Sequence, residues 1–236
     1  MAELRQIHAQ ELTSLADKAL HGLGCVSGGV VLMQGAHDWG AHERGYIELP
    51  TPEGTLVVPL AYDEREAPYT CDESGHEQAD FLLSLADEDD YLACFWAQAT
   101  PDSPLCGVGV DLSAAHHFHE RRSGRDLSRL LFTEHELVLA DQLEDDPLLA
   151  YATLFASKEA AFKATAAPLR RWYDSHDKQL LFEVRHFVME RPGAERGTGR
   201  NGAAQHAMDT MGISCIVLDH VCVENMALVV ATARRR

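Results

Sequence analysis

The sequence predicts an α+β protein of two related subdomains, each a small antiparallel sheet packed with a long helix. Three observations support this fold class. Short apolar runs rich in β-prone residues recur along the chain, separated by clusters of Gly, Pro, Asp and Glu. Longer stretches carry apolar residues at helical spacing. Each half of the chain also ends in two closely spaced apolar runs, which suggests a weak internal duplication.

The elements follow from apolar spacing and from boundary signals. The expected helices cover residues 3–20, 116–131 and 147–166. The expected strands are Gly29–Gln34, Thr55–Leu60, Phe81–Leu85, Tyr91–Ala97, Leu105–Leu112, Leu180–Val188, Ile213–Leu218 and Met226–Thr232. Asp146 and Pro147 predict the start of the last helix, and Pro168 predicts its end. Residues 191–206, which are rich in Gly and Arg, predict a mobile loop.

Charge is distributed unevenly along the 236 residues. Residues 1–105 hold 4 Lys+Arg against 19 Asp+Glu, a balance of −15, and residues 106–236 hold 16 against 18, a balance of −2. We expect an acidic N-terminal subdomain over 1–105 and a C-terminal subdomain over 106–236, which holds the candidate metal and catalytic motifs described below. Because nucleic acids and anionic membranes attract proteins through cationic side chains, the composition argues against both as partners.

The cellular compartment is inferred from the length of the apolar stretches and from the number and spacing of the cysteines. No apolar stretch approaches the ~20 residues that a membrane-spanning helix requires, and the first residues lack an apolar signal core. The six cysteines include no Cys-x-x-Cys pair. They are therefore expected to be reduced and mostly buried thiols, and the protein to be cytoplasmic.

The strand over Leu105–Leu112 alternates strictly between two faces. One face carries Val108, Val110 and Leu112, and the other carries Gly107, Gly109 and Asp111. The glycines leave room either for a bulky ligand to approach the Asp111 carboxylate or for a tightly crossing element beside a surface aspartate. The strand alone does not favour one interpretation over the other.

A second segment, FASKEAAFK, begins at Phe155 on the predicted helix. Phe155 and Phe162 are seven residues apart and mark a buried stripe, whereas Glu159 and Lys163 are four apart and share one face. Taken alone, a Glu and a Lys at this spacing indicate an ordinary surface pair that stabilises the helix by a few tenths of a kcal/mol.

Together and in this order, GVGVDLS, LLFTEHEL and FASKEAAFKA resemble the motifs of the 4′-phosphopantetheinyl transferase superfamily. Asp111 and Glu159 are 159 − 111 = 48 residues apart, which also fits that family. The motifs are most similar to the short holo-acyl-carrier-protein synthase branch, whereas the length resembles the double-length branch, in which two related halves form a pseudodimer. Two segments of this chain, Pro68–Thr70 and Leu83–Ala97, resemble the usual end of the first half in double-length members.

The resemblance implies transfer of the 4′-phosphopantetheine arm of coenzyme A to a serine of an acyl or peptidyl carrier protein. It implies that Asp111 and Glu159 bind Mg²⁺, whose preference for oxygen ligands suits two carboxylates. It also implies that Lys158 and Lys163 contact the coenzyme phosphates, with Lys163 counted among the catalytic residues. Either Glu159 or a water on the metal would deprotonate the acceptor serine.

Two positions differ from the double-length branch. Ser113 stands where a third acid often lies, and Asp87 stands where a histidine usually lies near the 3′-phosphate of the coenzyme. Asp87 and the acidic first half favour an alternative, a catalytically weak family member that acts as a binding or accessory protein. A Mg²⁺-dependent enzyme for another nucleotide pyrophosphate is a further alternative.

Basic residues follow the strand that carries Asp111, in the region where members of the family bind the carrier protein. We expect Arg121 and Arg122 to contact the carrier, although a solvated helix face is an equally good interpretation. His116, His117 and His119 invite a transition-metal interpretation, but no fourth ligand accompanies them at a characteristic spacing. Surface histidines are therefore favoured, with His117 available as a part-time cationic contact.

Overall fold

The computed structural model describes residues 5–6, 8–34, 45–51, 54–64, 66–118, 131–143, 146–176, 180, 183–188, 199–200 and 202–235. The strands are β1 (Arg5–Gln6), β2 (Cys25–Gln34), β3 (Tyr46–Thr51), β4 (Gly54–Tyr62), β5 (Pro68–Thr70), β6 (Phe81–Glu88), β7 (Tyr91–Ala99), β8 (Leu105–Ala114), β9 (Phe187–Val188), β10 (Gly199–Arg200), β11 (Ile213–Val223) and β12 (Met226–Arg235). The helices are α1 (Ala9–Leu20), α4 (Glu134–Leu143), α5 (Pro147–Lys163), α6 (Ala166–Ser175) and α7 (Gly202–Thr210), with short 3₁₀ helices η1 (Ala115–Phe118) and η2 (Val184–His186).

Two antiparallel sheets repeat one topology. The first has the strand order β1-β2-β7-β6, and the second has the order β11-β12-β8. In each half the first long strand, β2 or β8, pairs with the last strand of a later hairpin, β7 or β12. This repetition confirms the predicted α+β pseudodimer of two related subdomains. The division between residues 105 and 106, at the start of β8, stays a prediction.

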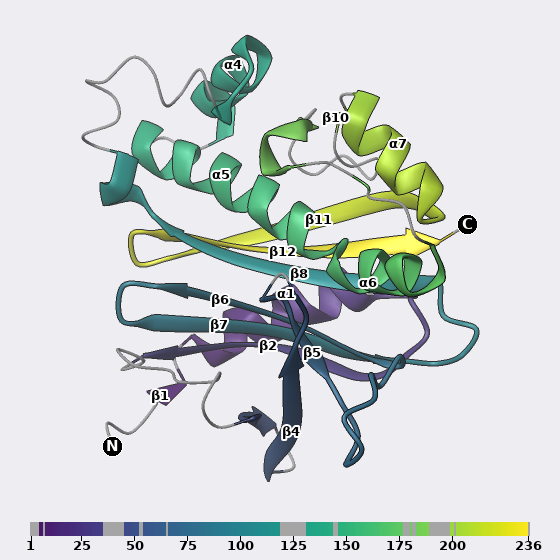
Figure 1. The fold of residues 1–236 in the computed structure, drawn as a ribbon. Helices are drawn as coiled ribbons and strands as arrows, with labels where there is room; N and C mark the ends of the chain where they lie inside the picture. Colours follow the sequence, from purple (N-terminus) through teal and green to yellow (C-terminus); the bar gives the residue numbers. More distant parts are fainter. Residues whose placement is uncertain are drawn as a thin grey trace.

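The two sheets pack face to face and enclose a core between them (Figure 1). Alternating residues of β8, Val108, Val110 and Leu112, point into this core, as the sequence predicts. They meet side chains of the first sheet such as Phe95, while Leu12 of α1 belongs to the same core. The backbone N–H of Val110 also donates a 3.0 Å hydrogen bond to Ser84 Oγ of β6, which joins the two halves directly.

The outer faces of the two sheets are covered differently (Figure 1). The long helix α5 packs on the outer face of the second sheet, where Ala160 and Val229 share one core. The small sheet β3-β4-β5 covers the outer face of the first sheet, where Ile47 packs with Trp96. The helix of the first half, α1, instead contacts both β2 and β11. The connections that follow β2 and β8 have therefore diverged between the halves.

Several predicted boundaries need correction. The first helix begins at Ala9 rather than residue 3, because Arg5–Gln6 pairs with β2. Asp146 caps α5 as predicted by accepting a 2.9 Å hydrogen bond from Leu148 N, but α5 ends at Lys163. Pro168 lies in the first turn of α6, where a residue without an N–H is tolerated.

Two further predictions were only partly right. The strand expected over residues 180–188 is reduced to Phe187–Val188 behind the turn η2, and part of the loop expected over 191–206 lies in β10 and α7. The helix expected over 116–131 begins as η1, and residues 119–130 lie outside the described part of the chain, including His119, Arg121 and Arg122. Among the described residues, none of the helices is long and apolar enough to cross a membrane.

Thiol labelling is predicted to distinguish the cysteines by depth. Cys71, Cys94 and Cys106 are buried, and burial raises the pKa of the Cys94 and Cys106 thiols, so little reactive thiolate forms. The exposed Cys222 should react with a maleimide in the native protein, whereas these three should react only after unfolding. Mass spectrometry of the labelled peptides checks this, and rapid native labelling of Cys94 would contradict the described packing.

Candidate active site

Asp111 lies on β8 opposite Val229 of β12, on the face of the sheet that α5 covers. Its carboxylate is largely enclosed, with the side chain 10% exposed. Oδ1 accepts a 2.7 Å hydrogen bond from Lys163 Nζ, whose side chain is 30% exposed. The Asp111 carboxylate is therefore held at the edge of the protein interior, within reach of a cationic partner from α5.

Gly107 and Gly109 bring α5 close to this strand. A Cβ built on Gly107 would lie 2.0 Å from the carbonyl oxygen of Ala164, and one built on Gly109 would lie 2.0 Å from the carbonyl oxygen of Ala160. Such distances are far inside van der Waals contact, so only glycine allows this approach. Of the two interpretations of the glycines, the tight crossing is correct, and the crossing element is the helix that carries Glu159. The aspartate beside it is buried, however, and not on the surface as that interpretation assumed.

Glu159 and Lys163 lie one turn apart on α5 and face the Asp111 strand as a group. Burial raises the pKa of Asp111 to about 7, Lys163 opposes this rise, and the charges of Glu159 and Glu88 add to it. Burial also raises the pKa of Glu159, and Lys163 again opposes the rise. The three side chains are thus electrostatically coupled, with two carboxylates sharing one ammonium group.

Glu88, at the end of β6, is a functional candidate that the sequence did not reveal. Its charge contributes to the raised pKa of Asp111, although it comes from the other half of the chain. Burial raises the pKa of Glu88 itself, while the neighbouring His117 lowers it. A third acid often lies at position 113 in the double-length branch that the sequence resembles, and this chain has a buried Ser113 there. Only the packing of β6 against β8 brings Glu88 near the site.

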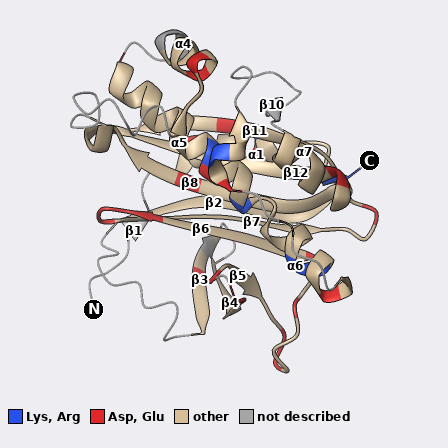
Figure 2. Ribbon diagram, turned by 45° about the horizontal axis from the view of Figure 1, so that its top comes forward, with Lys and Arg blue, Asp and Glu red and all other residues tan. Residues whose placement is uncertain are grey.

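A pocket between the two halves adjoins these residues. Its lining includes Lys163 from α5, Arg170 from α6, and Tyr69 and Phe81 from the first half. Arg170 lies over the Tyr69 ring at 4.6 Å and pairs with Glu77 at 3.1 Å. Figure 2 shows the basic residues of α6 beside this region and the acidic residues of the β6–β7 turn at the opposite end of the sheet. Lys163 therefore connects the site to a small pocket lined by aromatic rings and by the Arg170–Glu77 ion pair.

Lys158 does not join this pocket, contrary to its predicted contact with coenzyme phosphates. Its side chain is 1% exposed, and Nζ lies 3.0 Å from Glu136 Oε1 and donates a 2.6 Å hydrogen bond to the Leu131 carbonyl. Glu136 Oε2 also accepts hydrogen bonds from the Thr133 N–H at 2.7 Å and the Thr133 hydroxyl at 3.0 Å. Thr133, Glu136 and Lys158 thus form a buried network of hydrogen bonds around one ion pair, and this Lys158–Glu136 network joins the start of α4 to α5.

The other candidate residues from the sequence lie on β6, on η1 or outside the described residues. Asp87 is exposed on β6, whereas His116 and His117 lie on η1 and face Glu88 and Asp89. Arg121 and Arg122 lie outside the described residues. Of the residues predicted to bind metal or coenzyme, the structure brings Asp111, Glu159 and Lys163 together and keeps Lys158 apart.

Comparison with known proteins gives two kinds of match. Residues 107–207 match the model of the 4′-phosphopantetheinyl transferase superfamily. No protein with a curated description matches the chain. Among solved structures, the holo-[acyl-carrier-protein] synthase of Neisseria meningitidis matches with a TM-score of 0.43 and 19% identity, over 56% of this chain and 99% of that one.

Two other solved structures are similar in extent. The acyl carrier protein synthase of Mycobacterium tuberculosis matches with a TM-score of 0.39 and 22% identity, over 56% of this chain and 99% of that one. The Helicobacter pylori holo-[acyl-carrier-protein] synthase in complex with coenzyme A matches with a TM-score of 0.40 and 16% identity, over 53% and 98%. Each of these proteins is matched over nearly its whole length by little more than half of this chain.

Proposed function

We propose that this chain, which belongs to the 4′-phosphopantetheinyl transferase superfamily through residues 107–207, uses Mg²⁺ to transfer the 4′-phosphopantetheine arm of coenzyme A to a carrier-protein serine. The acceptor is an acyl or peptidyl carrier protein. The observation that supports this most directly is the electrostatic interaction of Asp111 on β8 with Glu159 on α5, two acids that are distant in sequence and near the same ammonium group of Lys163.

The donor chemistry of this pair fits Mg²⁺. Both ligand groups are carboxylates, which Mg²⁺ prefers, and two of them suffice because the ion keeps several waters. Burial, the main cause of the raised pKa values of Asp111 and Glu159, disfavours their charged forms, so a bound cation would stabilise both carboxylates. Bound there, Mg²⁺ would neutralise the charge that develops on a pyrophosphate under attack.

Lys163 is suited to hold the coenzyme phosphates. Its ammonium group donates a hydrogen bond to Asp111, and the residue also lines the small pocket between the halves. A lysine acts on phosphate as a compact point charge. The raised pKa of Glu159 also makes its carboxylate a stronger proton acceptor than an exposed glutamate, which suits deprotonation of the acceptor serine.

The proposal predicts that Asp111→Asn and Glu159→Gln each abolish transfer. The full chain is incubated with Mg²⁺, coenzyme A and a panel of apo carrier proteins, and mass spectrometry detects the added arm. Asp219→Asn is a matched control, because Asp219 is also a strand aspartate of the second sheet paired with a lysine, Lys18, and should keep wild-type transfer.

The possible results of this experiment distinguish the metal assignment, the transferase function and the accessory-protein alternative. Transfer that persists in both the Asp111 and Glu159 variants would refute the metal assignment while leaving the transferase activity intact. No transfer by the wild-type protein to any carrier would favour the accessory-protein alternative, for which Asp87 and the acidic first half argue. Loss of transfer in the Asp219 control would indicate that removal of any paired strand aspartate disturbs the fold.

A further inference from the structure

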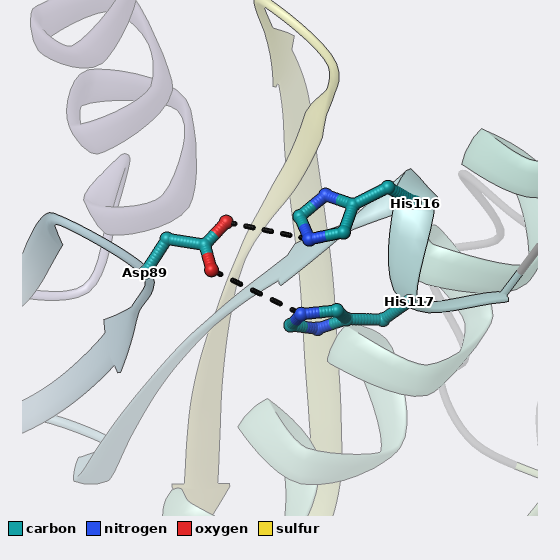
Figure 3. A group of neighbouring side chains, drawn as sticks. All are labelled: Asp89, His116 and His117. Atoms are coloured by element: carbon teal, nitrogen blue, oxygen red, sulfur yellow. Dashed lines mark ion pairs between the residues drawn. The ribbon is translucent and has the colours of Figure 1, made fainter.

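Three side chains with metal-ligating atoms meet at one end of the two sheets, as Figure 3 shows. Asp89 lies in the β6–β7 turn of the first half, and His116 and His117 lie on η1, directly after β8. Their ligand atoms all lie within 4.8 Å of one another, and all three residues are exposed. The cluster therefore joins the two halves at a place that an ion can reach from solvent.

The spacing of the cluster suits a small transition-metal ion. His116 Nε2 lies 3.6 Å from Asp89 Oδ2, and His117 Nε2 lies 3.9 Å from Asp89 Oδ1. Two ligands that bind one Zn²⁺ tetrahedrally at about 2.1 Å are roughly 3.4 Å apart. Small rotations of exposed side chains would close the difference. Two imidazoles and one carboxylate form a common ligand set for such ions.

Glu88 lies beside one of the two imidazoles. Its Oε1 lies 2.6 Å from His117 Nδ1, and this contact is an ion pair without hydrogen-bond geometry, because Glu88 Oε1 has no hydrogen-bond partner among the described residues. His117 Nε2 is the ring nitrogen that lies near Asp89. Metal-binding histidines usually make a hydrogen bond through the second ring nitrogen, which fixes both the tautomer and the ring direction. A small rotation of the exposed His117 ring would give Glu88 this role.

The backbone also holds the ligands in place. Asp89 has a left-handed conformation with φ 51°, which forms the tight turn between β6 and β7. The start of η1 is fixed by a 3.0 Å hydrogen bond from Ala115 N to the Asn225 carbonyl in the β11–β12 turn. The three ligands are therefore carried by two short turns, each attached to a sheet.

We propose that Asp89, His116 and His117 bind a divalent transition-metal ion of the Zn²⁺ class, with water completing its coordination. The nitrogen ligands favour Zn²⁺, Co²⁺ or Ni²⁺ over Mg²⁺, which prefers oxygen ligands alone. The site is thus distinct in residues and in chemistry from the pair Asp111 and Glu159. The sequence alone disfavoured it because Asp89 is far from the two histidines along the chain.

Metal titration tests this site without reference to transferase activity. ZnCl₂ is titrated into the full chain in a buffer that does not bind zinc, with calorimetric detection, and Co²⁺ absorption reports nitrogen coordination. His116→Ala and Asp89→Asn should each weaken Zn²⁺ binding by at least about tenfold, the smallest effect typical of losing even an outer partner of a metal site. His76→Ala is the matched control, because the exposed His76 also lies near a carboxylate, 3.8 Å from Asp72.

The comparison between variants decides the result, because the chain has thirteen histidines and six cysteines that can bind zinc weakly elsewhere. Wild-type affinity retained in His76→Ala and lost in the other two variants would support the site. Equal affinity in wild type, Asp89→Asn and a His116→Ala/His117→Ala double variant would overturn it, as would the lack of saturable binding to wild type. The cluster would then be a set of surface ion pairs.

Discussion

Replacing Lys158 with methionine is expected to lower the free energy of unfolding by about 3 to 5 kcal/mol, the cost typical of removing one partner from a buried ion pair. The ammonium group of Lys158 is enclosed, and burial lowers its pKa while Glu136 opposes that change. Methionine has similar length but no charge, so the Glu136 carboxylate would stay buried without its cationic partner. Urea denaturation monitored by circular dichroism measures the loss.

Two further variants sharpen this test. In Lys158→Met/Glu136→Gln, the amide oxygen can still accept the bonds from Thr133, and no unpaired charge remains, so much of the lost stability should return. Arg185→Met removes one partner of the exposed pair with Glu183 and should change stability by less than about 1 kcal/mol. A Lys158 variant no less stable than the Arg185 variant would show that the buried Lys158–Glu136 network contributes nothing to the free energy of unfolding.

Replacing Gly109 with alanine is expected to damage both stability and activity. The new methyl group would lie 2.0 Å from the Ala160 carbonyl oxygen and 2.6 Å from the Ala164 backbone nitrogen, atoms that no side-chain rotation can move. The helix α5 would have to shift away from β8. Overpacking of this kind typically costs about 1 to 3 kcal/mol, and the rigid backbone contact places this variant at the upper end or beyond.

The same shift would move Glu159 and Lys163 away from Asp111. Transfer should therefore fall more than the folded fraction falls, which is checked by measuring both at a temperature where the variant stays folded. Gly202→Ala is the matched control, because a Cβ there meets nothing within 4 Å, and its stability and transfer should stay close to wild type. If Gly109→Ala behaves like Gly202→Ala, the close β8–α5 approach is wrong.

Local patterns in the sequence were sufficient to predict the elements of the site. The alternation of β8, the capping of α5 by Asp146 and the Glu159–Lys163 spacing depend on neighbours in the chain, and the structure agrees with each. The glycines of β8 were placed on the correct face, but the pattern could not identify what approaches them. A ligand and a helix backbone require the same absence of a Cβ.

Contacts between distant segments could not be predicted in this way. Glu136 and Lys158 form an ion pair across two helices, and Glu88 comes from the other sheet. No local spacing signals such contacts, because they depend on how the completed elements pack. The internal duplication was also misleading in one respect, since it gave no sign that β3-β4-β5 would cover the sheet face that α5 covers in the second half.

The strand that carries Asp111 is at one end of its sheet, with the order β11-β12-β8. Such terminal strands tend to recruit other chains and aggregate unless they are shielded. Here β6 of the first half lies against β8, and Ser84 Oγ accepts a hydrogen bond from the Val110 N–H. Residues 106–236 expressed without the first half would expose both that backbone group and the apolar side chains of β8, so this fragment is expected to self-associate rather than remain monomeric.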